Sequence, residues 1–150
     1  MTTTLDAKVV EFARLGWEAS LHWTAPMTNW DTFVAVMRAA GRYNAFDGDA
    51  VADSFFDLFH DAMTVEFGRE GSPVMYISVP FFAHQRHGSD SACLSERLSD
   101  EERQQFTALV IEWAQNQRAD EISVQQFPAQ DGDIWGEPGP SPYRIRLWWD

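Results

Sequence analysis

The sequence predicts an α+β domain in which about four helices pack on a small, mostly antiparallel sheet. Apolar residues recur at helical spacing in four segments, and β-branched and aromatic residues are concentrated in several short segments. A long loop rich in Gly and Pro joins the last two short segments, as in an antiparallel hairpin. A chain of 150 residues can bury one substantial core, so we expect a single domain over residues 1–150.

The N-terminal third predicts two helices with a strand between them. Residues 4–16 have a helical apolar face, formed by Leu5, Val9, Phe12 and Ala13. Residues 17–23 alternate as in a half-buried strand, although a continuation of the helix also fits. Thr28 followed by Asp31 is a start signal for the second helix, and Gly41 lies near its end. The apolar side of this helix consists of Trp30, Phe33, Val34, Met37 and Ala40.

The segment DAVADSFFDLFHDAM, residues 49–63, predicts a third, amphipathic helix. Its aspartates recur every four positions on the predicted solvent face: Asp49, Asp53, Asp57 and Asp61. The opposite face holds Val51, Phe55, Phe56, Leu58, Phe59, Ala62 and Met63. No Lys or Arg lies between residues 46 and 67. Like charges four positions apart repel by roughly 0.2–0.5 kcal/mol per pair, so the pattern needs an explanation.

The C-terminal half predicts a strand, a helix and a final hairpin. The strand SPVMYISVPFF follows Gly71, and Pro80 marks its end or an edge position. Ser99 and Glu102 form a capping box for a helix whose apolar face consists of Phe106, Leu109, Val110 and Trp113. The last two strands are EISVQQF and YRIRLWW.

Alternation in the last strand separates two kinds of side chain. Arg144 and Arg146 share one face, whereas the other face consists of Ile145, Leu147 and Trp149. One of the two terminal Trp side chains should therefore point away from the core face unless another layer covers it.

Composition and charge narrow the classes of ligand. Hydrophobic residues make up 45% of the chain, which argues against disorder. The net charge of −12 argues against direct binding of nucleic acid, because phosphate contacts need clustered Lys and Arg. A basic protein surface is easier to accommodate, and the acidic surplus can also serve solubility alone. We expect no cofactor.

Several features predict a cytoplasmic protein. Cys93 is the single cysteine, which excludes an internal disulfide and favours a reducing compartment. The N-terminal residues lack the pattern of a signal peptide, and no segment is apolar enough to span a membrane.

The predicted acidic helix is the first candidate site. Aspartates four positions apart rise about 6 Å along a helix, so the four would form a slanted negative ridge about 18 Å long. His60 lies on the same face, beside Asp57, as a local charge balancer. As an interaction surface, the ridge would be neutralised by a basic partner and would steer its approach. As a solvated face, it would need no partner.

The segment HQRHGSDSAC contains a second candidate site. Four side chains with ligand atoms follow one another at three-residue spacing: His84, His87, Asp90 and Cys93. In a loop they can surround a transition metal, although the paired Cys-x-x-Cys pattern of zinc sites is missing. A polar surface loop is the simpler explanation of the segment, and a nucleophilic pair of Cys93 and His87 is a further alternative.

The segment QDGDIWGEPGPSP contains a third candidate site. Its acidic residues Asp131, Asp133 and Glu137 surround Trp135. Anionic groups around an aromatic anchor suit protein recognition, although Trp135 can also pack back onto the core. A calcium loop of the EF-hand type is excluded, because Pro142 stands where the twelfth, acidic residue is needed.

These observations favour an acidic binding protein that occludes a basic surface of a partner macromolecule, for example that of a nucleic-acid-binding protein. Carboxylates would take the place of phosphates, and Trp135 would add apolar contact. In composition alone, the chain resembles inhibitors such as toxin-immunity proteins and phage anti-defence proteins. The alternative is a small metal- or cysteine-dependent enzyme that uses the His84–Cys93 loop, although no standard catalytic signature is present. A homo-oligomer is a third interpretation.

Overall fold

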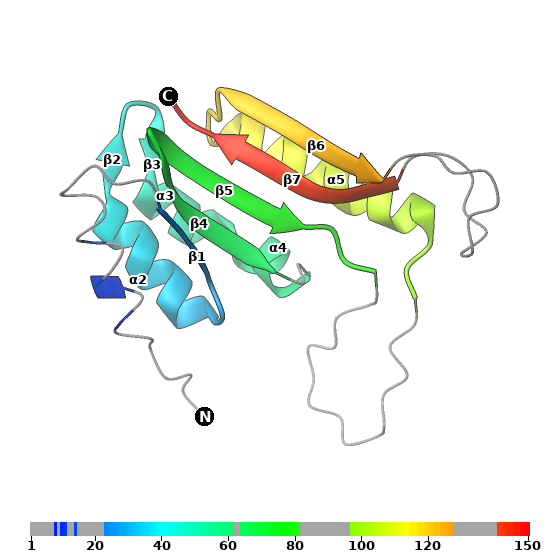
Figure 1. Cartoon of the computed structure of the whole chain (residues 1–150), viewed down its shortest axis with the longest axis horizontal. Helices are drawn as coiled ribbons and strands as arrows, with labels where there is room; N and C mark the ends of the chain where they lie inside the picture. The colour runs from blue at the N-terminus through cyan, green and yellow to red at the C-terminus, as the bar shows by residue number, and fades with distance from the viewer. Residues whose placement is uncertain are drawn as a thin grey trace, which may run out of the picture.

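A five-stranded antiparallel sheet with helices on one face forms the described part of the protein (Figure 1). The computed structural model describes residues 8, 10, 11, 14, 23–61, 64–81, 97–127 and 141–150, and only the backbone of 60, 61, 127 and 141. In spatial order the strands are β1 (Trp23–Pro26), β4 (Val65–Glu70), β5 (Ser72–Ser78), β7 (Ser141–Trp148) and β6 (Glu121–Phe127).

Helices cover one face of this sheet. Their bounds are α2 (Trp30–Ala40), α3 (Gly48–Ser54), α4 (Phe56–Asp61) and α5 (Asp100–Asn116). Figure 1 shows α3 and α4 behind β4 and β5, and α5 behind β6 and β7. A small antiparallel ribbon joins α2 to α3 and consists of β2 (Arg42–Tyr43) and β3 (Phe46–Asp47). The predicted α+β class, with helices on a mostly antiparallel sheet, is confirmed.

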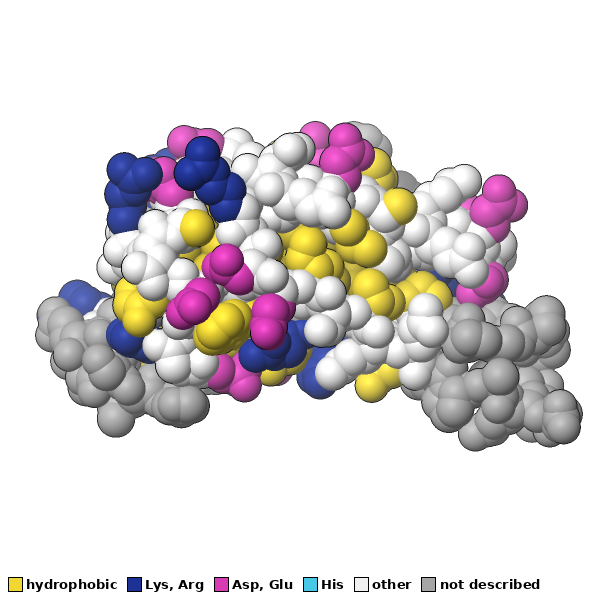
Figure 2. Space-filling model, turned by 90° about the horizontal axis from the view of Figure 1, so that it is seen from above, with side chains coloured by type: hydrophobic (Ala, Val, Ile, Leu, Met, Phe, Trp, Pro, Cys, Tyr) yellow, Lys and Arg dark blue, Asp and Glu magenta, His cyan; other side chains and the backbone are white. Residues whose placement is uncertain are grey.

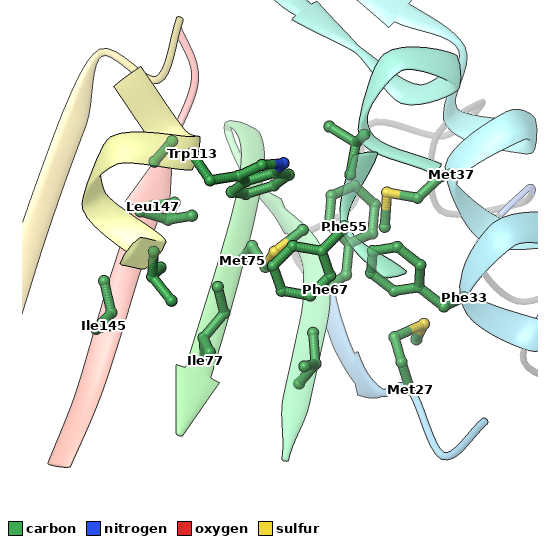
Figure 3. Packing of buried hydrophobic residues seen from close by; sticks show 14 of the residues in the cluster. Met27, Phe33, Met37, Phe55, Phe67, Met75, Ile77, Trp113, Ile145 and Leu147 are labelled. Atoms are coloured by element: carbon green, nitrogen blue, oxygen red, sulfur yellow. The ribbon is translucent and has the colours of Figure 1, made fainter. Parts of the chain in front are cut away.

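Aromatic side chains join the helices to the sheet. Phe33 of α2 stacks on Phe55 with ring centroids 5.4 Å apart, and Phe55 lies 4.6 Å from Trp113 of α5. Phe67 of β4 stacks on Phe46 at 5.6 Å. Figure 3 shows Phe33, Phe55, Phe67 and Trp113 lying together between the sheet and the helices. Full burial of one large apolar side chain contributes roughly 1.5–3 kcal/mol, so this cluster is a main source of stability.

The N-terminal elements agree with the prediction only in part. The described residues of segment 4–16 are helical: 8, 10, 11 and 14. Of segment 17–23, only Trp23 lies within the described residues, and it begins β1. The cap of α2 is Asn29 rather than Thr28. The Asn29 side chain accepts a hydrogen bond from the backbone N–H three residues later at 2.8 Å.

Strand β4 was not predicted from the sequence. Three of its six residues are charged and one is Gly68, so its β propensity is weak. It pairs with both β1 and β5, and the chain turns into β5 at Gly71, whose φ of 75° favours glycine. Gly68 allows β1 to approach closely, because a Cβ at this position would lie 1.8 Å from the carbonyl oxygen of Trp23.

The prediction of one continuous helix over residues 49–63 is wrong, because the helix is interrupted at Phe55. Phe55 ends α3 with φ −92° and ψ 0°, and α4 begins at the next residue. The Ser54 hydroxyl donates to the carbonyl oxygen of Ala50 at 2.7 Å, a local bond that often bends helices. Phe55 is fully buried, whereas Phe56, predicted for the same apolar face, is 48% exposed.

Helix α5 begins at the predicted capping box, but its buried face differs from the prediction. Three predicted core residues are buried: Phe106, Val110 and Trp113. Leu109 is 56% exposed, and Arg103 is fully buried instead. The Arg103 guanidinium donates to the carbonyl oxygens of Pro80, at 3.2 Å, and Pro142, and lies 3.9 Å from the ring centroid of Phe81. These contacts turn the arginine side of the helix inward.

The final strand follows the predicted alternation. One face is fully buried: Ile145, Leu147 and Trp149. Trp148 lies on the other face, together with the two arginines, and its Nε1 donates to the backbone oxygen of Glu70 at 3.2 Å. Because Glu70 belongs to β4, the indole lies across the intervening strand β5. That strand ends at Ser78, before Pro80, as predicted.

The sheet face away from the described helices carries a polar network centred on Tyr76. The Tyr76 hydroxyl donates to Glu70 at 2.5 Å and accepts from Arg146 Nε at 3.3 Å. Arg146 also pairs with Glu121 at 3.3 Å, and Arg144 lies 4.7 Å from the Tyr76 ring centroid. Burial raises the pKa of Tyr76, and the hydrogen bond to Glu70 raises it further, against the opposing effect of Arg146.

We expect Gly68→Ala to destabilise the fold by about 1–3 kcal/mol, because the added Cβ would force β1 away from β4. Urea unfolding followed by circular dichroism measures the change. Thr24→Ala, at the exposed position paired with Gly68, is the control and should have a much smaller effect. Equal stability of Gly68→Ala and wild type would contradict the close strand approach.

We expect Tyr76 to ionise at higher pH in the folded than in the unfolded protein. A raised folded-state pKa favours the neutral form. Its contribution to stability is therefore complete below the ordinary tyrosine pKa of about 10, and is lost as pH rises through the folded-state value. Titration of tyrosinate absorbance, with and without urea, measures the shift. In Tyr76→Phe this high-pH step should disappear; if it persists, the assignment is wrong.

Candidate functional site

The acidic residues of segment 49–63 are divided between two short helices. Asp47 caps α3, and its side chain accepts from the backbone N–H groups of Asp49 and Ala50 at 3.1 and 3.3 Å. Asp49 therefore lies in the first turn of α3, where the helix dipole favours a carboxylate. Asp57 is exposed in the first turn of α4, where the dipole of that helix likewise favours a carboxylate.

An arginine from outside the segment pairs with two of its aspartates. Arg38, in the last turn of α2, donates to Asp49 at 2.8 Å and to Asp53 at 3.1 Å. The two carboxylate side chains are nevertheless 64% and 69% exposed. Hydrogen bonds to Asp49 and Asp53 raise the pKa of Arg38 above its ordinary value. The repulsion between neighbouring aspartates that the sequence predicts is thus offset by a cation on the adjacent helix.

The predicted ridge is therefore only partly present as one surface. Asp49 and Asp53 stand together on α3, bridged by Arg38, whereas Asp57 stands beyond the interruption at Phe55. His60 and Asp61 belong to α4 by their backbone, and their side chains lie outside the described residues. The local sequence contains no signal for Arg38, because the pairing depends on how α2 packs against α3.

The other two predicted sites lie outside the described residues. These are the metal candidates His84, His87, Asp90 and Cys93, and the loop residues Asp131, Asp133, Trp135 and Glu137. The structure does describe where the two segments attach. The backbone N–H of Leu98 donates to the oxygen of Phe81 at 2.7 Å, which closes the first segment. Arg103 binds Pro80 before that segment and Pro142 after the second, so both attach near the same guanidinium.

Charged and apolar side chains are interspersed on the surface. In the face that Figure 2 shows, acidic side chains form several separate groups, and apolar side chains gather near the middle.

Within the described ranges, no group of three or more His, Cys, Asp and Glu side chains is placed to hold a metal ion. Among the described helices, none combines the length and apolar character needed to cross a bilayer.

No protein-family model, no curated protein and no solved structure matches the chain. The chemistry of the surface is therefore inferred from its own residues.

We expect Arg38→Gln to lower the thermal unfolding midpoint at low salt, because the repulsion between Asp49 and Asp53 is then no longer offset. The difference from wild type should shrink at high salt, since exposed charges are screened. Circular dichroism melts at two salt concentrations measure both effects. Arg42→Gln is the matched control, because Arg42 is 81% exposed and lies 3.9 Å from Asp47. An Arg38→Gln effect that is independent of salt would contradict an electrostatic role.

Proposed function

We propose that the chain is an acidic cytoplasmic binding protein that occludes a basic surface of a partner macromolecule, as an inhibitor of the toxin-immunity or anti-defence type does. The observation that carries the proposal is a contrast in the described part of the chain: several arginines are bound within the chain itself, whereas carboxylates such as that of Asp57 are exposed to solvent. Arg38, Arg103 and Arg146 each bind two or more groups of the chain itself. Asp57 and other carboxylates project into solvent, in a chain with net charge −12.

In this proposal, Arg38 fixes the arrangement of acidic side chains on the unbound protein. By holding Asp49 and Asp53 at 2.8 and 3.1 Å, it keeps two carboxylates close together before any partner arrives. A surface that is already arranged loses less conformational entropy on binding. Because Arg38 already binds Oδ1 of both carboxylates, the contact with a partner cation would depend mainly on Asp57 and on the exposed remainder of Asp49 and Asp53.

The occlusion of the partner's basic surface would depend on the negative charge and the position of the carboxylates on α3 and α4. Carboxylates on α3 and α4 would take the place that nucleic-acid phosphates occupy on a basic partner, and the net negative charge would accelerate encounter. We propose a second contact, which is predicted from the sequence alone. It is the loop that contains Asp131, Asp133, Trp135 and Glu137. No observation among the described residues favours the alternative enzyme based on the His84–Cys93 loop.

We expect affinity capture from the native host to recover a basic partner with wild-type bait and to lose it with Asp53→Lys/Asp57→Lys. Charge reversal replaces attraction by repulsion at the contact, so affinity should fall by about tenfold or more. Glu66→Lys is the matched control, because Glu66 lies on the sheet face opposite the helices. Circular dichroism verifies that each bait is folded.

Salt provides the second readout of the same experiment. Binding of the purified partner should weaken as salt concentration rises, because exposed charge pairs are screened. A partner that is retained equally by wild-type and Asp53→Lys/Asp57→Lys baits, or that binds independently of salt, would overturn the proposal.

A further inference from the structure

Strand β6 forms one edge of the sheet, and among the described residues it has a partner strand only on its β7 side. Figure 1 shows β6 as the outermost strand beside β7. Because the backbone groups of an antiparallel strand alternate in direction, half of the N–H and C=O groups of an edge strand point away from the sheet. These groups are a template for one further strand.

The hydrogen bonds between β5 and β7 fix the direction of the backbone groups in β7. At the two ends of this ladder, the N–H of Val79 donates to the carbonyl oxygen of Tyr143 at 2.9 Å, and the N–H of Trp149 donates to that of Pro73 at 3.0 Å. The odd-numbered residues of β7 therefore bond to β5. Since the direction alternates along an antiparallel strand, the even-numbered residues of β7 face β6.

This alternation identifies the outward-pointing groups of β6. Arg146 of β7 is paired with Ser123. The backbone groups of Ser123 consequently point to β7, whereas those of its neighbours Ile122 and Val124 point out of the sheet. The Ile122 and Val124 side chains are half-buried against the core. A further strand would therefore satisfy their backbone groups and cover the exposed remainder of their side chains.

Strand β6 lacks most of the devices with which natural proteins block a sheet edge, such as short length, proline and lysine. It is seven residues long, and its sequence EISVQQF contains no Pro, Lys or Arg. The register shift beside Gln125 skips Tyr143, so the extra residue belongs to β7 and not to β6. The opposite edge, β1, has four residues and ends in Pro26. Of the two edges, β6 is therefore the one suited to pairing.

The charge of β6 favours a second copy of the chain as the further strand. Glu121, at the start of β6, is the single charged residue of the strand, so this edge offers little attraction to a basic partner. In an antiparallel pair of two copies, the two Glu121 side chains lie at opposite ends of the ladder, roughly 20 Å apart. Like charges are therefore not placed opposite each other.

The outer-face side chains of β6 are complementary to those of a second copy. The register that pairs all seven residues places Ser123 opposite Gln125 of the second copy, and Val124 opposite Val124. Gln125 Oε1 accepts from Arg144 Nε at 2.5 Å, and no described residue accepts from its Nε2. Nε2 can therefore donate to the serine hydroxyl of the second copy. Two-fold symmetry forms this contact twice.

We infer that β6 pairs antiparallel with β6 of a second copy, so that two five-stranded sheets join into one across a two-fold axis. This dimer is independent of the proposed function, because the carboxylates of α3 and α4 lie on other elements. Repulsion between two copies of net charge −12 opposes pairing. Salt screens this repulsion, so dimerisation strengthens with salt, whereas binding of a basic partner weakens.

Sedimentation velocity over a dilution series, at two salt concentrations, measures the equilibrium between monomer and dimer. We expect wild type to dimerise reversibly, and more tightly at the higher salt concentration. Ser123→Lys/Gln125→Lys places lysines opposite one another in the dimer, so it should weaken dimerisation by about tenfold or more. Thr24→Lys/Gln105→Lys is the matched control, because it adds the same charge at exposed positions of β1 and α5. Circular dichroism verifies that both variants are folded.

Amide hydrogen exchange of the wild-type chain, resolved by residue with NMR, tests the edge without a substitution. Exchange at Ile122 and Val124 should slow as rising protein concentration drives dimerisation. Exchange at Ser123 and Gln125, whose N–H groups bond to β7, should be slow at every concentration. A chain that stays monomeric at both salt concentrations would overturn the inference. So would a dimer that leaves Ile122 and Val124 unprotected, or one that Ser123→Lys/Gln125→Lys does not weaken relative to the control.

Discussion

The packing of Phe55 between Phe33 and Trp113 determines how the acidic segment is presented. With centroid distances of 5.4 and 4.6 Å, the ring joins α2, the end of α3 and α5 in one buried contact. The helix is interrupted at this point, where Ser54 bonds back to Ala50 and also accepts from Trp113, and such back-bonding often bends a helix. A new helix therefore starts after Phe55, and the chain leaves the core with an aromatic and an acidic side chain pointing outward.

Arginine supplies the links that a strongly acidic chain needs. The chain has 11 cationic residues, and Lys8 is the only lysine among them. A planar guanidinium can serve several acceptors at once, which an ammonium does less well. Arg38 bridges two carboxylates, Arg103 binds two carbonyl groups, and Arg146 contacts two carboxylates and a tyrosine. Each of these arginines connects different parts of the fold, so three cationic side chains link several elements of an acidic chain.

Local signals in the sequence were reliable, and features that depend on tertiary packing were not. The capping box of Ser99 and Glu102 is present with both hydrogen bonds at 3.1 Å, because it involves residues only three positions apart. The fold class and the alternation of the last strand follow from equally local patterns. The interruption at Phe55, the pairing of Arg38 with α3 and the strand around Gly68 all depend on neighbours distant in sequence. The acidic helix was therefore predicted in composition but not in shape.

The burial of Arg103 has a consequence for acid tolerance. A guanidinium stays protonated throughout the physiological pH range, even where water is excluded, whereas a buried lysine or histidine can release its proton. The attachment of α5 to the residues after β5 and at the start of β7 is therefore permanently cationic. Under the proposed function, acidification that protonates surface carboxylates would weaken recognition of a basic partner while leaving this internal attachment intact.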